Sequence, residues 1–205
     1  MPTSRVEAFS DGVIAIAITL LILEIRVPEE VAATHGLTHA LGDQWSSFAA
    51  YLLSFLVIGI MWVNHHTLLA TVARVDRVLL LLNLFLLLWI AFLPFPTGLV
   101  ADYIRHGHDA KVAMAVYSGT MVACAVGFNG MWLWITRDTR LLHEHIDQPA
   151  AKASRRRFAF GILVYAATVV LSFISALATL VVHFAIAAYY VADQLAVRTG
   201  ADVQG

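Results

Sequence analysis

The residues most capable of chemistry in this sequence are ionisable side chains that lie in or beside long apolar stretches. Asp11 follows Ser10 near the start of the chain, and His65 and His66 lie at the end of a second apolar stretch. A carboxylate and an imidazole can exchange a proton, bind a metal ion or join a hydrogen-bonded cluster. A charged group near the centre of a membrane costs at least about 2.5 to 3.5 kcal/mol, so such groups need partners.

Pairs of histidines elsewhere in the chain could indicate a metal site, but their spacing does not support one. His35 and His39 are four residues apart in one loop, and His143 and His145 flank Glu144 in another. Neither pair has the spacing that places two ligands and a base on one helical face. We interpret them as solvated loop histidines and predict neither a bound metal nor a cofactor.

The elements that must position these groups are hydrophobic segments of membrane-spanning length. Of the 205 residues, 60% are hydrophobic and 13% charged, with a mean hydropathy of +0.78. A soluble domain usually carries about 25% charged residues. A helix needs roughly 20 apolar residues to cross a membrane. Uncharged stretches of about this length or more cover residues 45–63, 78–101, 112–136 and 158–192. The sequence therefore predicts an all-α integral membrane protein.

The last of these stretches is too long for a single crossing. As one helix it would extend about 52 Å, whereas the hydrocarbon core is about 30 Å thick. Ser172, Ser175 and Ala176 lie near its middle, where a helical hairpin can turn. We therefore predict one domain over residues 1–205 with six transmembrane helices, at about 6–27, 45–66, 78–101, 112–136, 156–173 and 176–195. Five helices, one of them projecting from the bilayer, is the alternative.

The distribution of Lys and Arg predicts the orientation in the membrane. With a cytoplasmic N-terminus, the outer segments hold Arg26, Arg105 and Lys111, and the inner segments hold the other ten of the 13 Lys and Arg residues. Cytoplasmic loops are enriched in these residues, so both termini are predicted to be cytoplasmic. The first segment, residues 6–27, is long and no convincing cleavage site follows it. It is therefore expected to be a retained helix rather than a signal peptide.

The first helix has a continuous face that excludes its acidic residue. At 100° per residue, four residues lie within about 60° of Ile16: Gly12, Thr19, Leu20 and Leu23. Asp11 lies about 140° away from Ile16 on the same helical projection. Asp11 is therefore expected to tie this helix to its neighbours rather than to face whatever the Ile16 stripe lines.

Depth in the membrane predicts which neighbours Asp11 meets. The first helix begins at the inner surface and the second ends there, so Ser10 and Asp11 lie level with the polar end of the second helix: Trp62, Asn64, His65 and His66. We expect Arg5, Ser10, Asp11 and one of the two histidines to form a hydrogen-bonded cluster, in which pairing offsets the cost of burying the acid. In the alternative, the histidines only mark the membrane–water boundary.

Two patterns in the later helices concern packing. Pro94 and Pro96 are predicted to kink or end the third helix. Small residues recur every four positions in the fourth helix, which allows another helix to approach closely: Ala115, Gly119, Ala123 and Gly127.

The start of the chain resembles the signature of the transmembrane-protein-175-like potassium channels. The matching run is Arg5-x-x-x-Phe9-Ser10-Asp11-Gly12, in a helix that continues as Ile16-x-x-Thr19-Leu20-x-x-Leu23. The Trp62-x-x-His65-His66 ending of the second helix, the chain length and the predicted helix count also agree with this family.

The resemblance implies a homotetramer in which four copies of the first helix surround a central pore. It implies that Ile16 forms the narrowest constriction, that Leu20 and Leu23 form further apolar rings, and that Thr19 faces the pore beside Ile16. It also implies a structural network that holds this helix in place: Arg5, Phe9, Ser10, Asp11, Trp62, Asn64, His65 and His66.

The predicted function is therefore a potassium-permeable cation channel in the cell membrane, most simply a bacterial plasma membrane. Its predicted partners are further copies of itself, membrane lipid and monovalent cations, and no nucleic acid. The Thr-Val-Gly-Tyr-Gly filter is absent, so selectivity would come from the constriction and its hydration.

A proton-coupled or metal-ion transporter is the alternative function, suggested by the nine histidines and Asp11. Such transporters usually have broken helices in matching halves, which this sequence lacks. A membrane-embedded enzyme would need convergent polar groups at one depth. Arg5, Ser10, Asp11 and His66 could supply them, but a structural network explains these residues more simply, so no enzymatic activity is predicted.

Overall fold

The computed structural model describes residues 3–26, 34, 36–137, 141–144 and 146–201, without the side chains of residues 157–158 and 193–201. His35, Arg140 and His145 lie outside the described residues. Across the described ranges the regular structure is helical, apart from an isolated bridge between Val72 and Leu142. The elements are α1 Thr3–Leu20, η1 Leu21–Glu24, α3 Leu37–Asp43, α4 Trp45–Ala70, α5 Arg77–Phe92, α6 Pro94–Tyr103, α7 Gly107–Arg137, α8 Gln148–Ile174 and α9 Ala176–Ala201.

Several of these helices have the length and composition of membrane spans. Among the described residues, five segments qualify: Thr3–Glu24, Trp45–Ala70, Arg77–Tyr103, Gly107–Arg137 and Gln148–Ile174. The described apolar part of α9, Ala176–Ala192, is shorter. The protein is thus an all-helical, multi-pass membrane protein, and the crossing by α9 stays a prediction.

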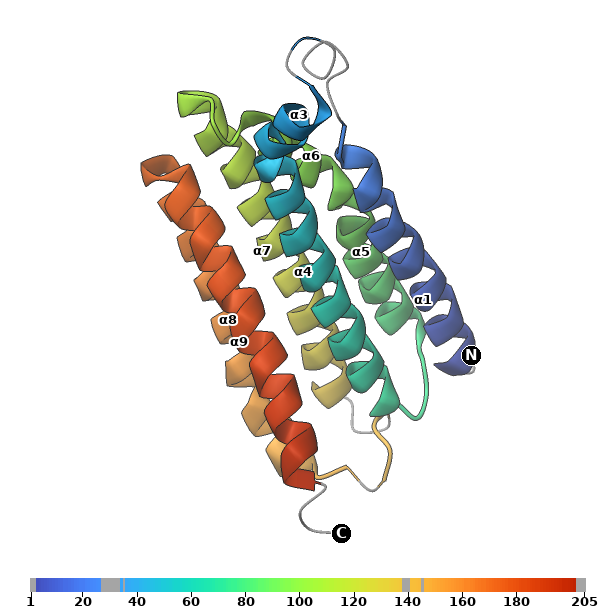
Figure 1. Cartoon of the computed structure of the whole chain (residues 1–205). Coiled ribbons are helices and arrows are strands. Elements are labelled where there is room, and N and C mark those ends of the chain that lie inside the picture. The colour runs from blue at the N-terminus through green and yellow to red at the C-terminus, as the bar shows by residue number, and fades with distance from the viewer. Residues whose placement is uncertain (1–2, 27–33, 35, 138–140, 145, 202–205) are drawn as a thin grey trace.

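The break between α8 and α9 falls at Ser175, within the segment where the sequence predicts a hairpin. The backbone of Ser175 is extended, with φ −147° and ψ 112°. Its amide N–H donates to the carbonyl of Leu171 and its carbonyl accepts from the amide of Thr179. Ser175 therefore ends one helix and starts the next, and the two helices pack side by side (Figure 1).

The first helix differs from the predicted single helix over 6–27. The α-helix begins at Thr3 and ends at Leu20, and a tighter 3₁₀ turn continues to Glu24. Such turns commonly finish α-helices. At this turn the Glu24 carboxylate lies so close to Gly98 of α6 that a side chain at position 98 would meet it. The short helix α3 was not predicted.

The two prolines act as a boundary between α5 and α6. α5 ends at Phe92, and Pro94 and Pro96 lie in the first turn of α6. Backbone N–H groups in a first turn have no partner within the helix, so proline is tolerated there. At the other end of α5, the Asp76 side chain caps the helix by accepting a 2.8 Å bond from the amide N–H of Leu79.

The helices form one bundle with α1 at one side and the α8–α9 pair at the other (Figure 1). α1 packs on α4 and α5, whereas α7 packs on α5, α6 and α8. α7 approaches α5 closely at Gly127, where an added Cβ would lie 3.1 Å from the Cβ of Leu86. Because α1 lies at the side of the bundle, one of its faces is left uncovered.

Candidate functional site

The uncovered face of α1 carries the apolar stripe that the sequence identifies. Ile16 and Leu23 are 62% and 61% exposed, and Leu20 is 42% exposed. Thr19 and Gly12 are exposed beside them. The opposite face is buried against α4 and α5, through Val6, Ser10, Ile14, Ala17 and Leu21. We name the exposed side chains of Ile16, Leu20 and Leu23 the α1 ridge. All three side chains of the ridge are exposed in the protomer.

Thr19 presents an oxygen atom on the same side of the helix as the ridge. Its hydroxyl donates within α1, to the carbonyl oxygens of Ala15 and Ile16, both at 2.9 Å. A hydroxyl has one donor and two acceptor lone pairs. With the proton directed at the backbone, Thr19 can offer a partial negative charge to a cation that passes the ridge.

Arg5 and Phe9 lie on this exposed side and not on the buried side. Phe9 is 55% exposed, and Arg5 is exposed as well. On a regular helix both lie about 20° from Ile16. Within one protomer, the described residues show no hydrogen bond or ion pair between Arg5 and Asp11. Arg5 therefore does not join Asp11 within the described protomer, because the helical register places Arg5 on the same side of α1 as the ridge.

Ser10 is held by a buried hydrogen-bonded chain that crosses three helices. The hydroxyl of Ser10 donates to the carbonyl of Val6 at 2.8 Å and accepts from Nδ2 of Asn83 at 3.0 Å. The Asn83 oxygen lies 2.7 Å from Nε2 of His65. Ser10, Asn83 and His65 are each at most 2% exposed. This chain links α1 to α5 and α4.

Asn83 was not among the residues predicted from sequence, although a signal for it existed. It is a polar side chain between apolar residues in the uncharged part of α5 that follows Arg77. A polar group in such a segment is costly unless it is hydrogen-bonded. Asn83 satisfies this requirement by bridging Ser10 and His65 through two hydrogen bonds.

Asp11 is held by an indole and not by an imidazole. Nε1 of Trp62 donates to Oδ1 of Asp11 at 2.9 Å, which ties α1 to α4. The ring of Trp62 stacks on that of His66, with centroids 6.4 Å apart and planes 30° apart. His65 and His66 therefore have different partners: His65 is hydrogen-bonded to Asn83, and His66 stacks on Trp62.

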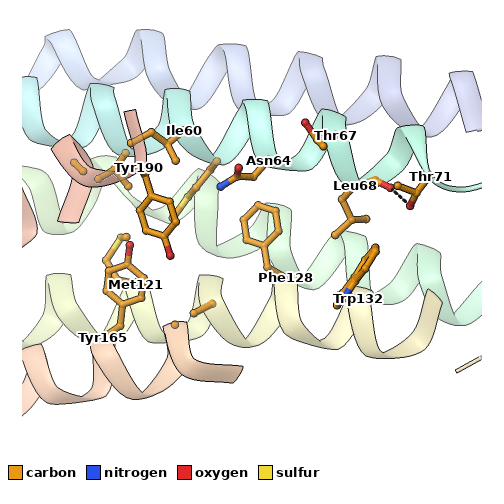
Figure 2. A pocket seen from close by; sticks show the side chains of 15 residues that line it. Ile60, Asn64, Thr67, Leu68, Thr71, Met121, Phe128, Trp132, Tyr165 and Tyr190 are labelled. Carbon is orange, nitrogen blue, oxygen red and sulfur yellow. Dashed lines mark hydrogen bonds between the residues drawn. The ribbon is translucent and has the colours of Figure 1, made fainter. Parts of the chain in front are cut away.

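Asn64 lies on a different side of α4 from Trp62 and His65. Its side chain lines a cavity between α4 and α7 (Figure 2). Successive residues on a helix are 100° apart, so Asn64 and His65 point to different neighbours. Elsewhere, no group of three or more His, Cys, Asp or Glu residues capable of holding a metal ion occurs in the described part of the chain.

Known proteins resemble this chain in both sequence and fold. A family model described as endosomal/lysosomal potassium channel TMEM175 matches residues 5–94. A potassium channel of Streptomyces collinus is 54% identical over 197 residues, which cover 96% of this chain and 95% of that protein. A potassium channel of Chamaesiphon minutus is 43% identical over 189 residues, covering 92% and 93% of the two chains.

The fold agrees with a solved structure as well. The crystal structure of a lysosomal potassium-selective channel TMEM175 homolog from Chamaesiphon minutus matches with a TM-score of 0.84 and 41% identity, over 93% of this chain and 97% of that one. Both bacterial relatives are matched over nearly their whole length, and the proteins are named as channels, not as enzymes. The chain therefore belongs to the TMEM175 channel family.

Proposed function

We propose that this protein is a potassium-permeable cation channel of the bacterial plasma membrane, in which four copies of α1 surround a pore. The observation that carries the proposal is the α1 ridge, which is exposed along one face while the opposite face is buried. The names of the bacterial relatives as potassium channels support the choice of ion.

Ile16 is proposed to form the narrowest ring, with Leu20 and Leu23 forming further apolar rings toward the outer side. α1 is α-helical through Ile16 and Leu20, so its backbone carbonyls bond within the helix instead of replacing the water around an ion. Rings of apolar side chains can gate a pore by excluding water. Selectivity in this proposal comes from the width and hydration of the Ile16 ring, with Thr19 supplying a polar oxygen beside it.

The hydrogen bonds behind α1 are proposed to set its rotation about its own axis. The chain from Ser10 through Asn83 to His65, and the separate bond from Trp62 to Asp11, attach two sides of the helix to α5 and α4. Loss of either attachment would allow α1 to rotate and would turn the ridge away from the axis of the pore. Arg5 and Phe9, exposed in the protomer, are proposed to meet neighbouring copies.

The proposed topology has six crossings with both termini in the cytoplasm. α9 supplies the sixth crossing and returns the chain to the side from which α1 starts. In Figure 1 the N-terminal end of α1 and the C-terminal end of α9 lie toward the same end of the bundle. The inner loops would then hold most of the Lys and Arg residues, as the positive-inside rule requires.

The test is conduction by the purified full-length protein in liposomes and planar bilayers. A channel gives unitary currents and potassium flux down a gradient, and its detergent-solubilised mass corresponds to four chains. A proton-coupled transporter instead gives saturable, pH-coupled flux that disappears in Asp11→Asn. Flux no greater than that of empty liposomes under several gating conditions, or a monomer in mild detergent, would count against the proposal.

A further inference from the structure

A cavity of about 430 Å³ lies between α4, α7, α8 and α9 (Figure 2). None of the described residues that line it belongs to α1, so it is separate from the ridge. Its size falls within the range of about 300–1,000 Å³ that is usual for small-molecule sites. The described lining residues lie on these four helices, apart from Thr71, which directly follows α4.

The described lining of the cavity carries no charged side chain. It contains no Asp, Glu, Lys, Arg or His, and its walls are mainly apolar and aromatic, as at Met121, Phe128 and Trp132. Burying a charge without a partner is very costly, whereas burying an apolar chain is favourable. The cavity therefore suits an uncharged molecule with a large apolar part.

Polar groups from three helices are nevertheless present in the same cavity. Figure 2 shows the amide of Asn64 on α4 and the ring of Tyr190 on α9 directed into the space that α7 closes with Phe128, and Tyr165 approaching from α8. An amide and phenolic hydroxyls donate and accept hydrogen bonds without being ionised. They would orient a hydroxyl or carbonyl group of a ligand.

The ring of Tyr165, which forms part of the cavity wall, is supported by a stacked histidine. The Tyr165 ring stacks on that of His183, with centroids 5.9 Å apart and planes 18° apart. His183 is buried, and its Nε2 lies 2.9 Å from the hydroxyl of Ser118. A side chain supported in this way keeps its position without a ligand, which lowers the entropy cost of binding.

The helix α8, which contributes to the cavity wall, also has apolar side chains exposed on the outside of the bundle. On α8, Phe160 and Leu163 are 64% and 66% exposed. α8 and α9 lie on the side of the bundle opposite to α1 (Figure 1). We propose that the cavity binds an uncharged amphiphile from the membrane, of the class of long-chain alcohols and acylglycerols, with its hydroxyl group at Asn64, Tyr165 and Tyr190. This site does not depend on the proposed conduction.

The experiment is photolabelling of the full-length protein in nanodiscs. The probe is hexadecan-1-ol carrying a diazirine in the middle of its chain, and mass spectrometry locates the labelled peptides. Labelling is expected on the segments of α4, α7, α8 and α9 that line the cavity, and excess unlabelled hexadecan-1-ol should suppress it. The matching fatty acid, which bears a charge, should label these segments at least about tenfold less, because its carboxylate finds no cationic partner among the described lining residues.

Glycine substitutions distinguish the cavity from the general lipid surface. Gly161 lines the cavity and has nothing within 4 Å of an added Cβ, so Gly161→Phe should direct an aromatic ring into the space. Gly119 on α7 has equal space around it but does not line the cavity, so Gly119→Phe is the matched control. Labelling of the lining segments should be lost in the first variant and retained in the second.

Tyr165→Phe provides a second test that preserves the shape of the wall. Removing one hydrogen bond should raise the concentration of alcohol needed for half-maximal labelling by about threefold to tenfold. The proposal is overturned if the lining segments are not labelled, as when a neighbouring copy fills the cavity. It is also overturned if Gly161→Phe leaves their labelling unchanged, or if the fatty acid labels them as strongly as the alcohol.

Discussion

The indole N–H of Trp62 on α4 donates a 2.9 Å hydrogen bond to the Asp11 carboxylate on α1. The bond joins the first described span to the next one along the chain, at the inner half of both helices in the proposed orientation. It lies on the side of α1 that is neither the exposed ridge nor the buried face. The bond therefore attaches the side of α1 to α4 and resists rotation of α1. The bond between Ser10 and Asn83 attaches the buried face of α1 to α5.

The Trp62–Asp11 bond should contribute measurably to the stability of the folded protein. Trp62→Phe removes the donor and should lower the free energy of unfolding by about 1–2 kcal/mol, because the acceptor is a carboxylate. A double-mutant cycle with Asp11→Ala should give a coupling energy of similar size. Trp45→Phe is the control, since Trp45 and Trp62 are 44% and 46% exposed on the same helix. Equal losses in both tryptophan variants would contradict the assigned role.

Asn83 should be more important for stability than the other buried asparagine described, Asn129. Asn83→Leu removes the bond to His65 and one of the two bonds of Ser10, which still donates to Val6, so the loss should be about 1–3 kcal/mol. The Oδ1 atom of Asn129 has no hydrogen-bond partner, so Asn129→Leu should be nearly neutral. Thermal unfolding in detergent measures the difference. A larger loss in Asn129→Leu would show that the Ser10–Asn83–His65 chain is not a main attachment of α1.

Widening the proposed constriction should increase conduction. Ile16→Asn replaces an apolar ring by amides that hold water, and we expect about a tenfold rise in potassium flux, equivalent to a barrier lowered by about 1.4 kcal/mol. Discrimination against sodium should fall at the same time. The matched control is Leu163→Asn on α8, because Ile16 and Leu163 are 62% and 66% exposed. If Leu163→Asn changed the potassium flux as much as Ile16→Asn, the result would contradict the proposal that the α1 ridge lines the pore.

Two glycines of α7 should respond differently to the same substitution. At Gly127 an added methyl group would lie 3.1 Å from the Cβ and 3.2 Å from the Cα of Leu86, and backbone cannot easily move aside. At Gly119 nothing lies within 4 Å. Overpacking costs about 1–3 kcal/mol, whereas Gly→Ala in an open helical position gains about 0.5–1 kcal/mol. Gly127→Ala should therefore unfold at a lower temperature than Gly119→Ala, and the opposite order would refute the close α5–α7 contact.

Much of the architecture follows from local properties of the sequence. Membrane spans depend on the length and apolarity of each segment, so the segments that begin near residues 45, 78 and 112 could be located from residue types alone. The separation of Ile16, Leu20 and Leu23 from Asp11 depends only on the 100° rotation per residue of an α-helix. The boundary at Pro94 and the break near Ser175 likewise reflect backbone chemistry that acts over a few residues.

The choice of partners within the bundle depended on tertiary structure. The sequence placed Ser10, Asp11 and the polar end of α4 at one depth, but depth does not specify how each helix is rotated against its neighbours. The rotation of α4 directs Trp62 toward Asp11 and His65 toward Asn83. It also places the side chain of Asn64 in the lining of a cavity. Asn83 could be recognised as the link between helices only after α5 was placed against α1. A hydrogen bond between two helices requires a suitable distance and angle, and residue spacing along one helix does not provide either.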